Sequence, residues 1–337
     1  MSPLNLVPPS TILVTGAGSR AAATVIRSLE RDPSITVIAA ESDPGAARAD
    51  TVDGRHRLIV PSGDDPHFVL HLLDVCIDRG VDVLIPTSGN ELAPLARAID
   101  RFAIYGIRIL VAPKEALACA FNKFALAIAL EDVVRVPRTE FADRTIASSW
   151  RYPVIARPRT DGVARDVAIV DSPEALRELS GDEELLIQEY LPGHEYVVDV
   201  LATHGPAAVV DVARVRPHEN VDVAAPNDAI RDDAIETFAR RVVEELGLSF
   251  ISEIRLRLNA KGEPVLVDVT PGISDSLALN GCAGLDMVRR AVDGLRGLEI
   301  PASIETSEVT RSHDLDATLA EFDVLFHEVR HVAMVAA

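Results

Sequence analysis

FISEIRLRLNAKGEPVLVDVTPG (residues 250–272) predicts two β-strands joined by a tight turn. Apolar and polar residues alternate along both strands, the pattern of a sheet with one face in a core and one outside it. A four-residue turn at 259–262 would set Glu253 directly opposite Asp268. Like charges paired across two strands are destabilising unless another group compensates them. The hairpin therefore predicts two carboxylates on a sheet that is anchored from behind. The anchoring residues would be Ile254, Leu256, Val265, Val267 and Val269.

The polar face of the predicted hairpin offers oxygen ligands for a cation. Thr270 shares that face with Asp268, as do Arg255 and Arg257 of the partner strand. Two carboxylates and a hydroxyl suit Mg²⁺, which proteins usually hold with one or two carboxylates plus substrate phosphates. A solvated face on which the arginines neutralise the acids is the alternative interpretation. Without a cation, we expect the two carboxylates to repel each other and at least one of them to have a raised pKa.

Two basic residues ahead of the hairpin are candidates for binding an anion. Lys123 lies in FNKF, and Arg157 ends the apolar run PVIAR. The whole chain has 33 Lys and Arg against 52 Asp and Glu, a formal charge of −19, which repels nucleic acids and anionic membranes at long range. A phosphate site in this protein must therefore be a local basic pocket, and we expect neither nucleic acid nor membrane as a partner.

ILVTGAGSRAAATVI (residues 12–26) predicts an apolar strand, a glycine turn and a helix. With Glu41 at the end of the next apolar run, the pattern is close to a dinucleotide-binding fingerprint, in which Gly16 and Gly18 let backbone N–H groups approach a phosphate. Every doubly wound domain needs a turn of this kind, so an NAD site and a structural turn both stay open. Apolar runs that alternate with amphipathic stretches over 11–112 predict a parallel sheet with helices on both faces.

Ligand contacts are expected where the parallel strands end. Ser88, Asn90 and Glu91 follow the apolar run VDVLIPT and are therefore candidate substrate residues. A helix cap at Ser88 with Glu91 three residues later explains the same residues equally well. Both interpretations stay open for this segment.

Nothing in the sequence predicts export or a membrane span. The three cysteines, Cys76, Cys119 and Cys282, are far apart and without C-x-x-C spacing, which is typical of buried thiols in a reducing compartment. No apolar run approaches the length of a membrane helix, and the N-terminus lacks the charged and apolar regions of a signal peptide. We therefore expect a cytoplasmic protein.

Five short motifs follow one another along the chain: NK (122–123), PVIARP (153–158), QEYLPGHE (188–195), ENVD (219–222) and DVTP (268–271), the last followed by SDSLAL (274–279). Their order resembles that of the ATP-grasp superfamily, and within it the branch of the carbamoyl-phosphate synthase large subunit and related carboxylate–amine ligases. The resemblance covers about residues 11–295. In that family the glycine-rich turn belongs to an N-terminal domain that helps to form the substrate cleft and does not bind NAD.

The resemblance implies an α/β protein in which a Rossmann-like parallel sheet precedes an ATP-grasp fold of two α+β subdomains. ATP would lie between these two subdomains. The implied domains are the Rossmann-like domain (1–113), a lid subdomain with its linker helix (114–190), a C-terminal subdomain (191–310) and a tail that packs on the core (311–337).

The resemblance also implies a role for the motif residues. Lys123 and Arg157 would contact the phosphates of ATP, and Glu195 would accept hydrogen bonds from the ribose. The strand 188–191 would bind adenine through its backbone, with the Gln188 amide near the exocyclic amine. The implied ATP-binding residues are Lys123, Arg157, Gly162, Gln188, Glu189, Tyr190, Leu191 and Glu195. The implied metal ligands are Glu253 and Asp268, to which the hairpin analysis adds Thr270.

Two departures from the family pattern concern catalysis. The flexible phosphate loop, TDGVARD (160–166), keeps one glycine, Gly162. The acid-x-Asn-Pro-Arg motif becomes Asp268-Val-Thr-Pro-Gly272, so a hydroxyl replaces an amide ligand and a phosphate-facing arginine is absent. The phosphate site must therefore draw its charge from other positions.

Other arginines are candidates for that missing charge. We expect Arg157 and Arg255 to be the catalytic residues, and Arg257 and Arg214 are further candidates for the place of the absent arginine. Arg214 is also a candidate substrate residue.

Three functions are compatible with these residues. The leading hypothesis is a Mg²⁺-dependent ligase that uses ATP to activate a small carboxylate, such as that of an amino acid, as an acyl phosphate, which an amine then captures. Its cofactors would be ATP and Mg²⁺, and its partners the small substrates and a second copy of the chain. A degenerate ATP-grasp protein that binds nucleotide or a metabolite without ligation is the second hypothesis. An NAD-linked oxidoreductase built on Gly16 and Gly18 is the third.

Overall fold

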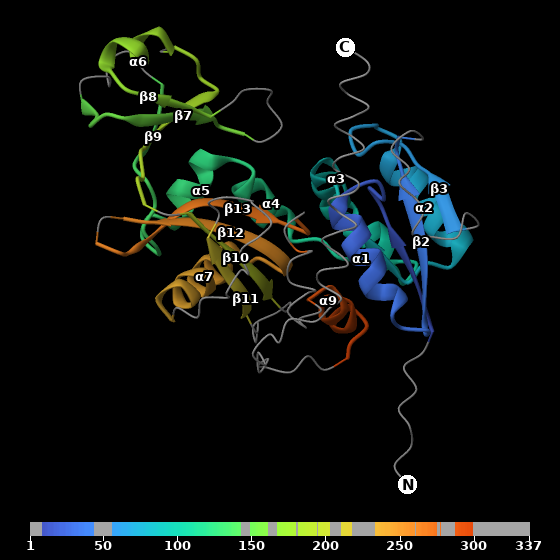
Figure 1. The fold of residues 1–337 in the computed structure, drawn as a ribbon. Coiled ribbons are helices and arrows are strands. Elements are labelled where there is room, and N and C mark those ends of the chain that lie inside the picture. Colours follow the sequence, from blue (N-terminus) through green and yellow to red (C-terminus); the bar gives the residue numbers. More distant parts are fainter. Residues whose placement is uncertain are drawn as a thin grey trace, which may run out of the picture.

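The computed structural model describes residues 9–43, 56–142, 149–160, 167–179, 181–193, 195–202, 210–217, 233–259, 261–274, 277 and 287–298. These residues form three sheets, one of five strands and two of four. We call the four-stranded sheet within 195–271 the base and the one within 139–189 the lid. Figure 1 shows the five-stranded sheet on one side of the molecule, with the base beside it and the lid beyond the base. None of the described helices has both the length and the apolar character that a bilayer span requires.

The N-terminal sheet is parallel and has the strand order β3-β2-β1-β4-β5. Its strands are β1 (Ser10–Val14), β2 (Ile35–Glu41), β3 (Arg57–Ile59), β4 (Val83–Ile85) and β5 (Arg108–Ile109). Its helices are α1 (Arg20–Glu30), α2 (Phe68–Arg79) and α3 (Gly89–Ala103). Ile12 and Val14 pack with α1 on one face, whereas Leu13 packs with α2 and α3 on the other. Burial on both faces explains the continuous apolar runs, and the predicted parallel sheet is confirmed.

The base is an antiparallel sheet in the order β11-β10-β12-β13. Its strands are β10 (Glu195–Ala202), β11 (Val210–Pro217), β12 (Phe250–Leu258) and β13 (Pro264–Pro271). The helices α4 (Lys114–Ala120), α5 (Lys123–Leu130) and α7 (Asp233–Leu246) pack on one face, against Val198, Ile254 and Leu256 among others. Side chains alternate along each strand, so the opposite face carries the charged residues of β10, β12 and β13.

The lid is an antiparallel sheet in the order β6-β9-β7-β8. Its strands are β6 (Thr139–Phe141), β7 (Val154–Pro158), β8 (Ala168–Val170) and β9 (Leu185–Glu189), and α6 (Pro173–Leu179) covers it. Val154 and Ala156 of β7 pack in the lid core with Trp150. The alternate residue Arg157 therefore points from the other face, towards β13 of the base.

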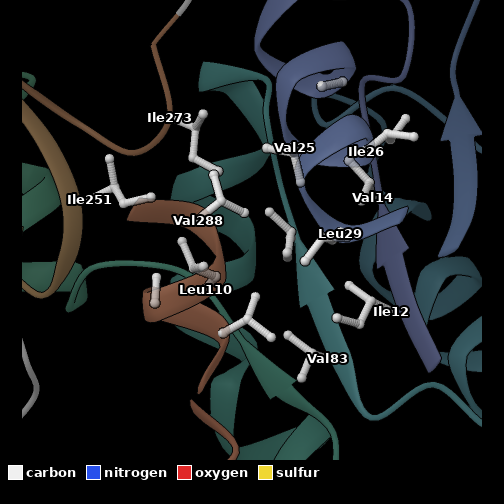
Figure 2. Close-up of a cluster of buried hydrophobic side chains, with 14 of the residues drawn as sticks. Ile12, Val14, Val25, Ile26, Leu29, Val83, Leu110, Ile251, Ile273 and Val288 are labelled. Carbon is white, nitrogen blue, oxygen red and sulfur yellow. The ribbon is translucent and has the colours of Figure 1, made fainter. Parts of the chain in front are cut away.

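Helix α9 (Met287–Leu295) joins the base to the N-terminal domain. Val288 packs in one cluster with Val25 and Leu29 of α1 and with Ile251 of β12 (Figure 2). The base and the parallel sheet therefore share a core, which fixes the polar face of the base relative to the ends of the parallel strands.

The predicted register of the β12–β13 hairpin is wrong. Glu253 lies opposite Thr270 and Arg255 lies opposite Asp268, so the two carboxylates are not a direct cross-strand pair. A shift of one residue would have moved one of them to the core face, but the observed shift of two residues keeps both on the polar face.

Two local features produce this shift. Asn259 pairs with Glu263, N–H to carbonyl oxygen at 2.9 Å, which makes the turn one residue shorter than predicted. A β-bulge in the middle of the hairpin adds a residue on β13. Beyond the bulge, Leu266 packs in the core. Val265 is buried as expected, whereas Val267 is only partly buried.

A buried carboxyl ties the ends of β1 and β4 together. Glu91 is 3% exposed and accepts a hydrogen bond from the Thr15 hydroxyl at 2.5 Å. It also accepts from the backbone of Ser88 and Thr87 at the start of α3, as the cap hypothesis expects. Burial, with the nearby charge of Glu41, raises the pKa of Glu91 from 4.5 to about 7.

This raised pKa predicts that Glu91→Gln stabilises the protein above neutral pH. The folded state holds the proton more tightly than the unfolded chain, so the free energy of unfolding falls as pH rises from 4.5 to about 7, by roughly 3 kcal/mol. Glutamine keeps the shape and an acceptor without the charge. Urea unfolding at about pH 5 and about pH 8 should show an advantage of the variant that grows at the higher pH. An advantage that is the same at both pH values would contradict the prediction.

Candidate functional site

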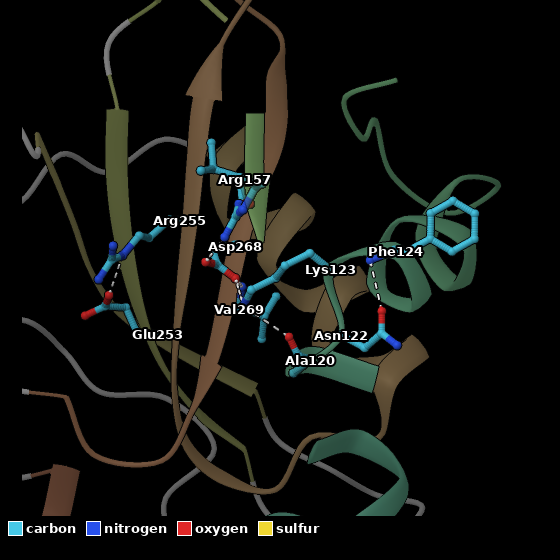
Figure 3. A network of polar contacts seen from close by, with 10 residues as sticks. Ala120, Asn122, Lys123, Phe124, Arg157, Glu253, Arg255, Asp268 and Val269 are labelled. Carbon is cyan, nitrogen blue, oxygen red and sulfur yellow. Dashed lines mark hydrogen bonds and ion pairs between the residues drawn. The ribbon is translucent and has the colours of Figure 1, made fainter. Parts of the chain in front are cut away.

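Asp268 lies at the centre of an ion cluster between the lid and the base (Figure 3). Its Oδ1 is 2.6 Å from Lys123 Nζ, and its Oδ2 is 3.0 Å from Arg157 Nη2. The side chain of Lys123 is 3% exposed, and those of Arg157 and Asp268 are 13% and 16% exposed. Charges at this depth are weakly screened, so the structure brings these three predicted site residues together as one tightly held group.

Each charge of the cluster is placed by a different element. Lys123 begins α5, whose N-cap Asn122 accepts hydrogen bonds from the backbone N–H groups of Phe124 and Ala125, at 3.2 Å each. Arg157 projects from β7 of the lid, where its Nη1 also donates to the Val267 carbonyl at 3.3 Å. Asp268 lies beside the bulge of β13. The site is therefore assembled from the linker helix, the lid and the base.

The chain enters the predicted phosphate loop next to Lys123. Asn122 forms a bridge with Thr160, and the Lys123 backbone N–H donates to the Arg159 carbonyl at 2.8 Å. The loop therefore starts within reach of the cluster.

Several residues that the sequence analysis names lie outside the described part of the chain. They are Gly162, the motif ENVD (219–222), Cys282 and residues 299–337.

Repulsion between carboxylates does not govern Asp268. Burial raises the pKa of this carboxyl, but Lys123 and Arg157 more than offset the rise and hold its pKa below the ordinary value. The expectation of a raised pKa is therefore wrong for Asp268. The physical reason is the register, which sets Asp268 opposite Arg255 instead of Glu253, while two further cations reach it from other elements.

Glu253 is the second carboxylate of the polar face and is 3% exposed. Arg255 Nε donates to its Oε1 at 2.8 Å, and Asp199 of β10 lies directly opposite it. Asp199 is 1% exposed. We did not predict Asp199, although its position in the strand EYVVDVLA places an acid on the polar side. Arg214 of β11 is opposite Asp199 in turn, and its side chain lies outside the described part.

The side-chain oxygen atoms on the polar face suit a Mg²⁺ ion that is bound together with a phosphate. Glu253, Asp268 and Thr270 share this face. Among the described residues, no group of three or more His, Cys, Asp or Glu could hold a metal ion alone. Mg²⁺ is commonly held by one or two carboxylates while phosphates and waters complete its shell. Two carboxylates and a hydroxyl therefore suit a cation that is bound together with a polyphosphate.

Arg257 makes several hydrogen bonds to the segment that connects the lid to the base. Its Nη2 and Nε donate to Glu195 Oε2 at 2.9 and 3.1 Å, and its Nη1 donates to the Leu191 carbonyl at 3.0 Å. Gly193 lies so close to β12 that a Cβ would be 1.7 Å from the Leu258 carbonyl oxygen. Glu195, the predicted ribose acceptor, is thus oriented by an arginine for which the sequence suggested another role.

The predicted adenine strand is β9 with the residues that follow it. Gln188 is 6% exposed, and its Nε2 donates to the Thr139 hydroxyl at 2.9 Å. The Glu189 backbone N–H donates to the Arg138 carbonyl at 2.9 Å. Tyr190 follows Glu189, and after it comes Leu191, whose carbonyl oxygen accepts a hydrogen bond from Arg257. This segment therefore has a fixed backbone at the junction of the two subdomains.

The candidate substrate residues of the N-terminal domain have structural contacts. Asn90 Nδ2 donates to Ser62 Oγ at 3.2 Å and to Asp64 Oδ2 at 2.8 Å. Glu91 is buried as the cap described above. The Ser88 hydroxyl makes no cap bond. The cap hypothesis is thus supported for Glu91, and a substrate role of Ser88 and Asn90 stays a prediction.

The glycine turn of the N-terminal domain already binds an acid of its own chain. The Gly18 N–H donates to Glu41 Oε2 at 2.6 Å, and Glu41 Oε1 accepts from the Ser42 and Asp43 N–H groups at 2.6 and 3.2 Å. In a dinucleotide site the turn approaches a phosphate and the acid binds a ribose hydroxyl. Here the acid binds the turn itself, which disfavours the NAD hypothesis.

Gly272 stands at the position where the family motif has an arginine. Gly272 has φ 107°, which residues with a Cβ rarely adopt, and a Cβ there would be 3.2 Å from Leu92 of α3. Arg255 offers a guanidinium group on the same polar face, with a side chain that is 40% exposed. Apart from the Nε bond to Glu253, no described residue hydrogen-bonds to it. Its two Nη groups are therefore available to a ligand.

Two family models match the sequence. The model described as PylC-like, N-terminal domain, matches residues 12–110, and the model described as ATP-grasp in the biosynthetic pathway with Ter operon matches residues 181–318. D-alanine–D-alanine ligase of Thermotoga petrophila is 32% identical over 103 residues, 29% of this chain and 34% of that protein. The same enzyme of Petrotoga mobilis is 22% identical over 119 residues, 34% of this chain and 40% of that protein. The matches thus span less than half the length of these relatives.

Solved structures share the fold over most of the chain. The biotin carboxylase domain dimer of Hydrogenobacter thermophilus 2-oxoglutarate carboxylase, in complex with MgADP, ADP and bicarbonate, aligns with TM-score 0.71 and 16% identity over 89% of this chain and 72% of that one. L-amino acid ligase from Bacillus licheniformis aligns with TM-score 0.69 and 15% identity over 90% of this chain and 78% of that one. Residues 181–318 therefore belong to an ATP-grasp domain, which a PylC-like N-terminal domain at residues 12–110 precedes.

Proposed function

We propose that this protein is a cytoplasmic ligase that uses ATP and Mg²⁺ to activate a small carboxylate, such as that of an amino acid, as an acyl phosphate for capture by an amine. The ion cluster at Asp268 carries the proposal, because three elements bring two cations to a carboxylate there. A Mg²⁺–polyphosphate complex needs such cations for its phosphates and carboxylates for its metal. The D-alanine–D-alanine ligases and the L-amino acid ligase named above support an amino acid as the carboxylate.

The phosphate end of the site follows from the cluster. Lys123 and Arg157 would bind the phosphates, and Glu253, Asp268 and Thr270 would hold Mg²⁺. The metal ion supplies positive charge at the oxygens that surround the transferred phosphoryl group. The residues of the chain then act by positioning the reactants and by stabilising charge, which is most of what phosphoryl transfer requires.

The nucleoside end would lie at the junction of lid and base. We assign adenine to the segment of Gln188, Glu189, Tyr190 and Leu191, whose backbone is fixed by its contacts with Arg138 and Arg257. Glu195 would accept from the ribose. Its carboxylate is held in place by Arg257, so an orientation for the ribose exists before ATP binds.

Arg255 is the residue that we assign to the transferred phosphoryl group. Glu253 fixes its Nε, while its two Nη groups are available on the polar face. A guanidinium group can bind two oxygens of a phosphoryl group at once, which a lysine cannot do. Arg255 would thus supply the charge that Gly272 cannot, and Arg157 would act on the neighbouring phosphates.

A nucleotide-binding protein without ligase activity is the second candidate function. Gly272 favours it, because it stands in place of the arginine of the family motif. The single glycine of the phosphate loop points in the same direction. ADP formation separates the two functions, as set out below.

The remaining partners are part of the same proposal. Ser88, Asn90, Glu91 and Arg214 stay candidate residues for the carboxylate and amine substrates. A homodimer is supported by the domain dimer among the structural neighbours. No described helix could span a membrane, and the formal charge of −19 argues against nucleic acid.

The first test is ADP and phosphate release with Mg·ATP over pools of amino acids and amines. We expect release above the background for at least one pair. Mg·ADP should also stabilise the protein by about 2.7 kcal/mol at a hundredfold excess over Kd, whereas NAD should not. Stabilisation by Mg·ADP without turnover on any pool would favour the second candidate, and stabilisation by NAD alone would contradict both.

Asp268→Asn tests the metal assignment. Because Lys123 and Arg157 lose the carboxylate that they share, we expect the ligand-free variant to unfold about 3 kcal/mol more easily, the opposite of the sign that carboxylate repulsion would give. The variant should also lose the extra thermal stabilisation that Mg²⁺ adds to ADP, since a hard cation loses a carboxylate. A destabilised variant with an unchanged Mg²⁺ effect would identify Asp268 as a structural ion-pair residue only.

Arg255→Lys tests the catalytic assignment. The charge remains, but the fork of the guanidinium group is lost, so we expect kcat to fall by at least about a hundredfold. The Kd of Mg·ADP should change by less than about threefold, because Lys123 and Arg157 remain. Single-turnover ADP formation and ADP binding measure the two effects separately. A raised Kd with an unchanged kcat would assign Arg255 to nucleotide binding instead.

A further inference from the structure

We infer that Asp268 makes nucleotide capture depend on the divalent cation: without the cation its carboxylate engages the two basic side chains that bind phosphate, and with the cation it releases them. The inference rests on the proposed nucleotide site. It does not depend on turnover or on which carboxylate and amine are ligated.

Both carboxylate oxygens of Asp268 are engaged in the ligand-free structure. Oδ1 accepts from Lys123 Nζ at 2.6 Å and from the Val269 backbone N–H at 2.8 Å, and Oδ2 accepts from Arg157 Nη2 at 3.0 Å (Figure 3). A metal ion that coordinates these oxygens needs lone pairs that now face an ammonium or a guanidinium group. Metal binding and the two ion pairs therefore compete for the same atoms.

Phosphate oxygens would compete with the Asp268 carboxylate for the same two basic side chains. Lys123 is buried and Arg157 Nη2 points at Asp268, so a phosphate oxygen reaches these cations by taking the place of the carboxylate. A metal-free polyphosphate also brings negative charge next to Asp268, where screening is weak. With Mg²⁺ bound, Asp268 would coordinate the cation instead of the two basic side chains, and the cation would cancel part of the phosphate charge. Asp268 thus selects the magnesium complex against the free nucleotide.

The test compares ADP binding to the wild type and to Asp268→Asn by equilibrium dialysis, in EDTA and in excess Mg²⁺. We expect Asp268→Asn to bind metal-free ADP at least about fivefold more tightly than the wild type, because Lys123 and Arg157 lose the competing anion. Mg²⁺ should tighten ADP binding at least about tenfold in the wild type and have little effect in the variant. Metal-free binding that is unchanged or weaker in Asp268→Asn would overturn the inference.

A second comparison, made in the Arg157→Gln variant, reduces the effect of the lower stability of Asp268→Asn. Arg157→Gln removes one of the two cations, so adding Asp268→Asn to it leaves fewer unpaired charges than the single variant has. The double variant should bind metal-free ADP more tightly than Arg157→Gln alone. Equal or weaker binding by the double variant would also overturn the inference.

Glu184→Gln is the matched control. It removes a lid carboxylate that pairs with Arg159 at 2.7 Å and has the same effect on net charge. It should leave ADP binding unchanged in both buffers, and a gain equal to that of Asp268→Asn would reveal a general charge effect and overturn the inference. A wild type that shows the expected ADP binding but no turnover would refute the ligase function and support the inference, whereas a wild type that binds no ADP would refute both.

Discussion

The pairing of Asp268 with Lys123 and Arg157 is the interaction on which the rest of the site depends. It joins the linker helix and the lid to the base through one carboxylate. In a chain with a formal charge of −19, it also brings two largely buried cations to one carboxylate. Removing Asp268 would leave Lys123 and Arg157 buried without the carboxylate that they share, which is costly in a poorly screened site. The geometry of this ion cluster is therefore maintained by electrostatics in the ligand-free protein.

Much of this arrangement follows from local patterns in the sequence. Alternation of apolar and polar residues assigns Glu253, Asp268 and Thr270 to one face of the hairpin, and that assignment is confirmed. The alternation is sufficient for this assignment because successive side chains of a strand point to opposite faces, whichever strand lies beside it. Continuous apolar runs likewise predict the parallel sheet, whose strands are buried on both faces.

Pairings between distant residues could not be predicted in the same way. The register of the hairpin depends on one residue in the turn and one in the bulge, and neither changes the alternation that the sequence displays. Lys123 and Asp268 are separated by 145 positions, so their contact depends on how α5 docks on the base. In a dinucleotide fingerprint, the residues at Gly18 and Glu41 would contact the ligand. Here the Gly18 N–H donates to the Glu41 carboxylate instead, although the residue types are the same.

Gly193 has a consequence for the alignment of the base strands. Its contact with the Leu258 carbonyl leaves no space for a Cβ, so the start of β10 is anchored at a single point against the end of β12. A slip of β10 by one residue would turn Glu195 and Asp199 into the apolar core and bring Tyr196 and Val198 to the polar face. Gly193, which has no side chain and no charge, thus helps to set which carboxylates lie on the polar face of the base.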